Sequence, residues 1–363
     1  MKKIVIFFID TVYQLISAFN LKQSVFVDDH VTIVMSKDTP SFAQLFAQKK
    51  LCECFDTVLY AEWPEVEKRY KIKSPFLLTS RRSEKILSEV YGCTIHRHDI
   101  CFIANRVPIV FMFLNVLKKK NKNLKMYEFD EGVDSYIHDR PRSPAGRIAK
   151  VVDRLFYFAP KGMYDNCYLH APEFYTADTF SDVLPIPIML TEQTTCLNKF
   201  NEVFDYSPDD NTFPQKYVFL EEADDNISDK PQYRKLVNDM IALVGRENII
   251  VKRHPRNTST FGIPDVEVLK TIAPWELFVA NGALKDKIMI SLASSTSYTS
   301  VIFSRYQLKS VVLHDVANGL QNASMGSYGL RVNAFGQKIS ERDKRFVIPK
   351  NKQELISALD LDK

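Results

Sequence analysis

The sequence predicts an α/β protein built from two Rossmann-like domains. Short β-like runs alternate with helix-like runs along the chain, which is typical of parallel sheets covered by helices. The length of 363 residues suits two domains of about 100–200 residues each. The stretch from Leu184 to Phe213 is rich in prolines and polar clusters and interrupts this alternation. We therefore place the junction there and expect domains at residues 1–190 and 191–363.

The first half carries six candidate strands. The opening run "MKKIVIFFID" is interpreted as a strand and not as a signal peptide, because Asp10 ends it and no small-residue cleavage site is obvious. Residues 11–24, "TVYQLISAFNLKQS", have apolar side chains at helical spacing. The expected strands are Lys3–Ile9, Val31–Met35, Thr57–Tyr60, Ile100–Ala104, Leu124–Phe129 and Leu155–Phe158.

The second half repeats the alternation more clearly. Helices are expected over "PQYRKLVNDMIALVG", "PWELFVANGAL" and "SYTSVIFSRYQ", with a short terminal helix in "NKQELISALDLDK". The expected strands are Tyr217–Glu221, Ile249–Lys252, Val266–Leu269, Ile288–Ser291, Ser310–Leu313 and Phe346–Ile348. Ligands of open parallel sheets bind outside the carboxyl ends of the strands, so the residues just after these runs matter most.

The composition argues against a nucleic-acid partner and for a reducing compartment. The formal charge is only +4, from 48 basic and 44 acidic residues. The six cysteines have no C-x-x-C spacing and form no dense framework, so free thiols are expected and a cytoplasmic location with them.

One apolar segment raises the question of a membrane. The run "VPIVFMFLNVL", residues 107–117, is about half the length that spans a bilayer. The basic cluster "KKKNKNLK", residues 118–125, follows it. This cluster is interpreted either as a solvated helix end or as a peripheral contact with the anionic inner face of the cell membrane.

Two strand ends carry acidic residues. In "EFDEGVDSY", a strand runs into Asp130, Glu131 and Gly132, and a carboxylate beside a glycine suits a general base. An acidic surface turn and a metal site are the alternatives. In "FLEEADDN", residues 219–226, Glu222 or Asp224 offers a second candidate for the base or for a donor contact.

The segment "IIVKRHPRN", residues 249–257, predicts an anion site. His254 follows a strand and precedes a proline, with Lys252 and Arg253 beside it. A histidine can donate a proton to a departing phosphate oxygen, because its unperturbed pKa is near 6.5. The alternative is a histidine that only caps a loop.

Hydroxyl groups and a helix start complete the candidate site. In "IMISLASSTSYTS", five hydroxyl residues precede or open a helix, and a helix N-terminus binds anions. In "IAPWELF", Glu276 follows a proline at a routine helix start, or it accepts hydrogen bonds from ribose hydroxyls. An anion pocket in one domain and a carboxylate in the other suit group transfer from a nucleotide-linked donor to a hydroxyl acceptor.

The order of these motifs resembles the bacterial sialyltransferases of glycosyltransferase family 52, the lipooligosaccharide and capsule type. The motifs are Asp-Glu-Gly at 130–132, His-Pro at 254–255, Pro-x-Glu at 274–276 and Ser-Ser-Thr at 294–296. The opening "FFIDTVYQLISAFN" is similar to that family's first strand and T-x-x-Q-L helix. Each motif is short, and the resemblance spans Thr11 to Ser297.

The resemblance implies a GT-B fold, in which two Rossmann-like domains face a central cleft. It also implies CMP-sialic acid as donor, inversion at the anomeric carbon and no cofactor or metal. The N-terminal domain would hold the glycan acceptor and the C-terminal domain the nucleotide. On this chain, His254 would assist departure of the CMP phosphate, Glu276 would hold the ribose, and Asp130 or Glu131 would be the base. Of the two acids, Glu131 is favoured by its place next to the glycine. Thr11 and Gln14 would lie near the sugar, and the same phosphate would be bound by Ser294, Ser295 and Thr296.

Two other activities stay open. Some members of the same family resemble hexosyltransferases that use UDP-sugars. The CDP-glycerol glycerophosphotransferases also combine a GT-B-like fold, a His-Pro turn and a serine pair, but their serine pair typically follows Asp-Tyr, where Leu292–Ala293 stands here. A non-enzymatic glycan- or nucleotide-binding module is a third interpretation. A second copy of the chain, in a homodimer, is kept as a further partner.

Overall fold

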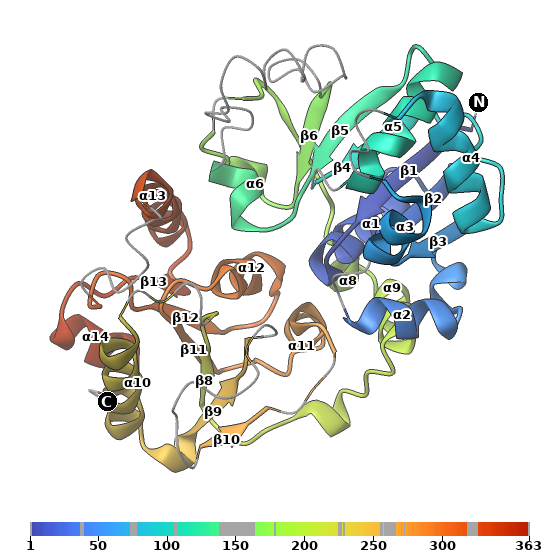
Figure 1. The fold of residues 1–363 in the computed structure, drawn as a ribbon. Coiled ribbons are helices and arrows are strands. Elements are labelled where there is room, and N and C mark those ends of the chain that lie inside the picture. Colours follow the sequence, from blue (N-terminus) through green and yellow to red (C-terminus); the bar gives the residue numbers. More distant parts are fainter. Residues whose placement is uncertain are drawn as a thin grey trace. The chain divides into compact units, whose positions relative to one another are not determined.

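The chain forms two compact units, Met1–Phe204 and Asp205–Lys363, in a computed structural model (Figure 1). The division falls later in the chain than the boundary expected after residue 190. The structure describes residues 2–36, 40–72, 78–104, 108–137, 164–177, 179–223, 227, 229–254, 257, 266–269, 271, 273–317 and 326–361.

The first unit contains a seven-stranded sheet in which every neighbouring pair of strands is parallel. Its order, β3-β2-β1-β4-β5-β6-β7, is the Rossmann order with one strand added. The strand order reverses between β1 and β4, so this unit's switch point lies there. The strands are β1 (Ile4–Ile9), β2 (His30–Ser36), β3 (Thr57–Ala61), β4 (Ile100–Ile103), β5 (Lys125–Phe129), β6 (Asn166–Leu169) and β7 (Val183–Pro185).

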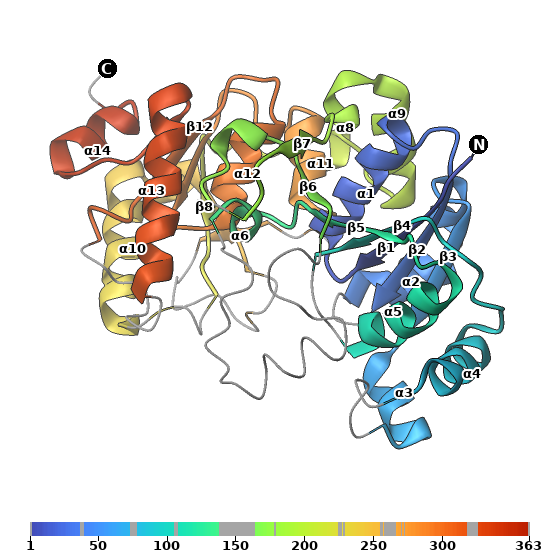
Figure 2. The ribbon, with the colours of Figure 1, turned by 90° about the horizontal axis from the view of Figure 1, so that it is seen from above.

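Helices cover both faces of this sheet because its strands are apolar on both sides (Figure 2). Ile6 and Phe8 of β1 belong to the core beneath α3, α4 and α5, whereas Phe7 points to the other face and contacts Phe26 after α1. Phe19 of α1 packs on Phe200 of α9, with ring centroids 4.8 Å apart. The helices are α1 (Val12–Ser24), α2 (Pro40–Ala47), α3 (Trp63–Tyr70), α4 (Ser80–Tyr91), α5 (Pro108–Lys120), α6 (Val133–Ile137), α8 (Met189–Glu192) and α9 (Thr194–Val203).

The second unit repeats this plan with a six-stranded parallel sheet of order β10-β9-β8-β11-β12-β13. The order is again that of a Rossmann fold, and it reverses between β8 and β11. The strands are β8 (Tyr217–Leu220), β9 (Ile249–Lys252), β10 (Glu267–Val268), β11 (Ile288–Ser291), β12 (Lys309–Val312) and β13 (Phe346–Val347).

Two groups of helices enclose the second sheet. Tyr233 of α10 and Leu355 of α14 join one core cluster with Phe219 of β8. On the other face, Tyr298 of α12 packs on Phe335 of α13, with ring centroids 5.4 Å apart. The helices are α10 (Lys230–Val244), α11 (Trp275–Ala280), α12 (Ser295–Phe303), α13 (Gly326–Arg342) and α14 (Lys352–Ala358).

The expected α/β alternation is confirmed, and several elements were not expected, among them two strands of the first sheet and one long helix of the second unit. Strands β6 and β7 and helix α13 have no counterpart in the sequence prediction, and the expected strand Leu155–Phe158 lies outside the described residues. The sequence of α13 contains interior glycines, which disfavour a helix, and for this reason α13 was not predicted. Gly336 allows close packing there, since a Cβ atom would lie 3.1 Å from Ile348 and 3.3 Å from Tyr298.

Candidate functional site

In the first unit, Gln14 ties the carboxyl end of β1 to the segment after β5. Thr11 caps α1 by accepting the Gln14 N–H at 3.2 Å, and Gln14 Oε1 accepts the N–H groups of Asp10 at 2.6 Å and Thr11 at 3.3 Å. Gln14 Nε2 donates to Glu131 Oε2 at 3.3 Å. The structure therefore brings together Thr11, Gln14 and Glu131, which the sequence assigned to one region.

Asp130 is enclosed by the protein itself. Its side chain is fully buried and accepts hydrogen bonds from Tyr136 Oη at 2.5 Å, Gly132 N at 2.9 Å and His170 N at 3.0 Å. Burial raises the pKa of Asp130 to about 6, although these hydrogen bonds favour the ionised form. A carboxylate committed to three donors of its own unit stabilises the turn after β5, and it is poorly placed to reach a ligand.

Glu131 and Gly132 are placed differently. Glu131 is half-buried, and its backbone N–H donates to Ser135 Oγ at 3.0 Å. Gly132 has φ of +110°, a conformation that favours glycine, and a Cβ atom built on it would meet no described residue within 4 Å. The Glu131 side chain is thus less buried than that of Asp130, which the protein encloses.

The network behind Asp130 involves two residues that sequence reasoning missed. Ser17 Oγ donates to the Asp130 carbonyl at 3.0 Å and lies 3.2 Å from His170 Nε2. Burial lowers the pKa of His170 to about 3, so its imidazole is neutral at pH 7. Ser17 follows Gln14 by three positions and so shares its face of α1, which is a signal the sequence does contain. His170 directly follows β6 (Asn166–Leu169), a strand that was not predicted.

In the second unit, three strands end in register at the switch point. Leu220 of β8 pairs with Lys252 of β9 on one side and with Ser291 of β11 on the other. The segments that follow these three residues therefore begin at the same edge of the sheet. They hold Glu222, His254 and the Ser294–Thr296 run, all singled out in the sequence.

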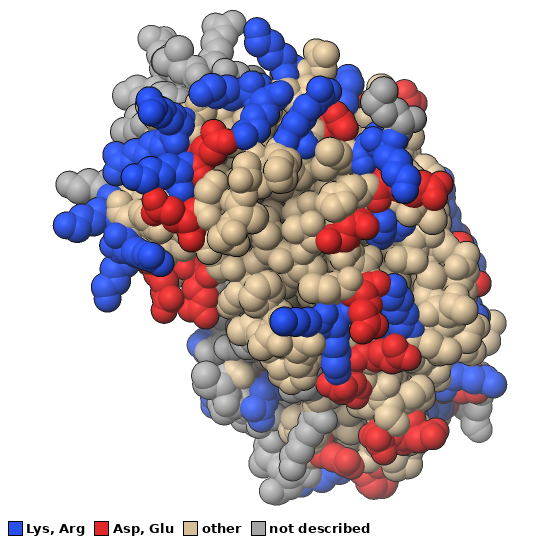
Figure 3. Space-filling model, turned by 90° about the vertical axis from the view of Figure 1, so that its right-hand side faces the viewer, with Lys and Arg blue, Asp and Glu red and all other residues tan. Residues whose placement is uncertain are grey.

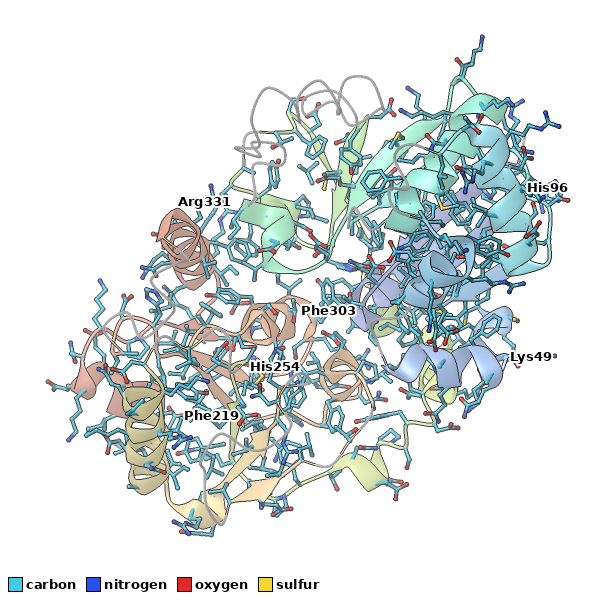
Figure 4. All side chains as sticks on the ribbon, viewed as in Figure 1. Lys49, His96, Phe219, His254, Phe303 and Arg331 are labelled. Atoms are coloured by element: carbon cyan, nitrogen blue, oxygen red, sulfur yellow. The ribbon has the colours of Figure 1, made fainter. Side chains whose placement is uncertain are left out.

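Two glutamates after β8 bond to the segments on either side. Glu222 Oε1 accepts the Ala293 N–H at 2.9 Å, and Glu221 Oε2 accepts the His254 N–H at 3.2 Å. Both glutamates are buried, and burial raises the pKa of Glu222 to about 7 against the effect of the Ala293 bond. Hydrogen bonds thus hold the backbone of His254 (Figure 4) and the residue before Ser294 at one edge of the sheet.

The hydroxyl residues divide into two groups. Ser291 and Ser297 are buried and lie 2.6 Å apart, Oγ to Oγ, so this pair serves the packing of α12 on β11. Ser294 is the N-cap of α12, but its side chain forms no capping hydrogen bond. Ser295 is exposed and Thr296 half-buried in the first turn. The helix start that carries Ser294, Ser295 and Thr296 has the donors of an anion site.

Lys252 and Glu276 lie on neighbouring elements beside this edge. Lys252 Nζ lies 5.5 Å from the ring centroid of Trp275, which donates from Nε1 to Ser300 of α12 at 2.8 Å. Burial lowers the pKa of Lys252 and raises that of Glu276, and the attraction between the two charges opposes both shifts. Arg253 has a buried Nε with no hydrogen-bond partner among the described residues.

Two further sequence predictions concern Asp224 and a metal ion. Asp224, the alternative to Glu222, lies outside the described residues. Within the described ranges, no cluster of three or more His, Cys, Asp or Glu residues could hold a metal ion. The predicted absence of a metal requirement stays a prediction.

Comparison with known proteins identifies the fold. The sequence matches no protein-family model and no curated protein. The structure of UGT89C1 from Arabidopsis thaliana in complex with UDP aligns with 99% of this chain and 93% of its own, at a TM-score of 0.51 and 10% identity. The fold is GT-B.

Other solved structures align with the GT-B chain at lower TM-scores. They include MnaA from S. aureus with UDP (TM-score 0.47, 11% identity, 95% of this chain and 90% of that one). The UDP-GlcNAc 2-epimerase from Neisseria meningitidis bound to UDP-GlcNAc has a TM-score of 0.43 and 10% identity, covering 100% and 98%. At such identities the likeness concerns the fold and not the activity.

Residues 108–117 of the apolar segment lie in helix α5, and the basic cluster runs from the end of α5 through the following turn to the first residue of β5. No helix in the described part of the chain has the length and apolarity to cross a membrane. Lys120 pairs with Glu84 at 2.5 Å, and Lys125 pairs with Asp165 at 2.6 Å. Figure 3 shows many Lys and Arg side chains toward the upper edge of one face. Lower on that face, Asp and Glu side chains alternate with them. Peripheral membrane contact and a homodimer stay predictions.

Proposed function

We propose that this GT-B protein is an inverting, metal-independent sialyltransferase. It moves sialic acid from CMP-sialic acid to a terminal galactose-type sugar of a bacterial surface glycan, in a capsule or a lipooligosaccharide. The second unit binds the nucleotide and the first unit binds the acceptor. The proposal rests on the motifs that resemble glycosyltransferase family 52 and on the two Rossmann strand orders.

One observation supports the nucleotide site above all others. Glu221 and Glu222, adjacent after β8, bond to His254 on one side and to Ala293 on the other. A proton donor and a helix start with three hydroxyl groups thereby belong to the same switch-point edge, where ligands of such sheets bind. A nucleotide phosphate there would take hydrogen bonds from Ser294, Ser295 and Thr296.

The proposed reaction is a single displacement. The Glu131 carboxylate takes the proton of the acceptor hydroxyl, whose oxygen attacks the anomeric carbon of sialic acid. The bond from that carbon to the phosphate oxygen breaks, and His254 donates a proton to the departing CMP. Attack opposite to the leaving group inverts the configuration. Asp130 holds the turn that carries Glu131, because its own carboxylate is enclosed.

The remaining residues take supporting roles in this proposal. Lys252 and Arg253 add positive charge near the phosphate, and Glu276 accepts hydrogen bonds from the ribose. Glu222 supports the hydroxyl segment through Ala293. Thr11, Gln14 and Gly132 shape the acceptor side around Glu131.

The test is incubation with CMP-sialic acid and several galactosyl acceptors in the presence of EDTA. Mass spectrometry of the glycan and chromatography of CMP would detect product, and both should appear. UDP-hexoses and CDP-glycerol serve as competing donors, the first because the aligned Arabidopsis protein was solved with UDP. Transfer from one of these donors and not from CMP-sialic acid would replace the proposal, and absence of any transfer would end it.

A further inference from the structure

Asn257 ends the segment 249–257 but was given no role from the sequence, and it makes three hydrogen bonds around His254. Its Nδ2 donates to Glu221 Oε2 at 2.9 Å and to the Glu222 carbonyl at 2.8 Å. Its backbone N–H donates to the His254 carbonyl at 3.0 Å. Glu221 Oε2 also accepts the His254 N–H at 3.2 Å. The backbone of His254 is therefore held at both its N–H and its carbonyl group.

These bonds extend the contact between β8 and β9 beyond the last paired residues. The ladder ends where Leu220 pairs with Lys252, and the Glu221 N–H donates to the Lys252 carbonyl at 3.0 Å. β9 ends at Lys252, so the regular pairing stops there. The proline after His254 has no N–H group to donate. The Glu221 carboxylate and the Asn257 amide supply the missing hydrogen bonds.

The same geometry explains how the Glu221 carboxyl group can be buried. Only 2% of the residue's surface is exposed, and a buried carboxylate requires donors. His254 N and Asn257 Nδ2 are two of them. Removing the Asn257 amide takes a donor from a buried carboxylate and releases one side of the turn at the same time.

We propose that Asn257 and Glu221 are positioning residues for His254. They fix the backbone from which the imidazole is presented to the leaving phosphate, and they do not contact the substrate. This inference rests on the proposed transferase function for its kinetic effect, because a proton donor misplaced by about 1 Å can lose about 10²-fold in rate.

The kinetic test compares Asn257→Ala, His254→Ala and the double variant. Asn257→Ala should lower kcat at least tenfold and leave the Kd for CMP within twofold, measured by calorimetry. The double variant should be no slower than His254→Ala alone, since Asn257 would act only through His254. Asn248→Ala is the matched control, because Asn248 bonds to Val244 before β9 begins. Full kcat in Asn257→Ala, or independent losses that multiply in the double variant, would overturn the inference.

A second measurement does not depend on activity. Amide hydrogen exchange at His254 should rise at least tenfold in Asn257→Ala and stay unchanged in Asn248→Ala. Asn257→Leu, which keeps the branched shape of the side chain and removes the donor, takes the place of the alanine variant if the latter does not fold. Unchanged exchange at His254 would contradict the positioning role of Asn257, even if transfer is found. Absence of transfer in the wild-type protein would contradict the proposed function. Hydrogen exchange would then still test whether Asn257 holds the backbone of His254.

Discussion

The Glu222 carboxylate accepts the backbone N–H of Ala293 at 2.9 Å, which links the end of β8 to the turn before α12. The link crosses the switch point of the second sheet, between its neighbouring strands β8 and β11. It brings an acid to the residue that precedes Ser294. Burial raises the pKa of this acid to about 7, so its charge changes in the range where the protein would work.

Glu222 should make stability depend on pH. Its folded pKa lies above the ordinary value of 4.5, so the folded state binds the proton more tightly, and stability falls as pH rises from 4.5 through 7. The full effect is at most about 3 kcal/mol, at 1.36 kcal/mol per pKa unit. Thermal denaturation at pH 5 and pH 8 should show that the melting temperature of Glu222→Gln rises relative to that of the wild type as pH increases. The exposed Glu341→Gln serves as control, and a pH-independent difference for Glu222→Gln would refute the assignment.

Substitution of Asp130 should mainly lower stability, whereas substitution of Glu131 should mainly lower activity. In Asp130→Asn, one acceptor oxygen becomes an NH2 group that faces groups which themselves donate hydrogen bonds to Asp130. The free energy of unfolding should therefore fall by about 1–3 kcal/mol. Glu131→Gln changes a half-buried side chain, so the melting temperature should stay within about 2 °C, whereas transfer should drop by about 10²-fold or more. Denaturant titration and initial rates measure the two effects. Full activity in Glu131→Gln would remove it as the base.

His98 should oppose folding in mild acid. It is buried before β4, and burial lowers its pKa to about 4 from 6.5. The unfolded state then binds the proton more tightly, and stability is lost as pH falls from 6.5 toward 4, by about 3 kcal/mol at most. Thermal denaturation of His98→Gln should show a smaller loss over this range. His96→Gln, at an exposed position (Figure 4), should follow the wild type; equal slopes for all three proteins would contradict the prediction.

The hydroxyl groups at the start of α12 should contribute to nucleotide affinity. Replacing Ser294 and Ser295 with alanine removes two donors from the proposed phosphate site, and the Kd for CMP should rise about tenfold or more. The exposed Ser357→Ala of α14 is the control. Calorimetry measures both variants. An unchanged Kd in the double variant would mean that the phosphate, if it binds, does so elsewhere.

The strands that carry the candidate nucleotide site were predicted well from the sequence. The bounds of β9 and β11 agree with the prediction, because each strand is a short apolar run bounded by polar residues. His254 lies two residues after β9 and Ser294 three residues after β11, so parallel pairing was enough to place their segments at one edge of the sheet. The two halves with Rossmann-like alternation were predictable for the same reason.

Packing between distant segments was not predictable. The glycine in "FDEG" favoured Glu131 as the base, but it does not predict that Asp130 is enclosed. The donors of Tyr136 and His170 enclose Asp130, and His170 directly follows the unexpected β6. Likewise, Ser291 and Ser297 look like members of the anion motif, yet they bond to each other in the core. Asn257 and Glu221 were passed over because their role exists only once β8 and β9 are neighbours.

The most direct test of the account is a structure of the protein with CMP bound. The account predicts that the CMP phosphate lies within hydrogen-bond distance of the His254 imidazole and of at least one hydroxyl among Ser294, Ser295 and Thr296. A phosphate bound away from both groups, or a crystal soaked in millimolar CMP that shows no nucleotide at the β8–β11 edge, would contradict it.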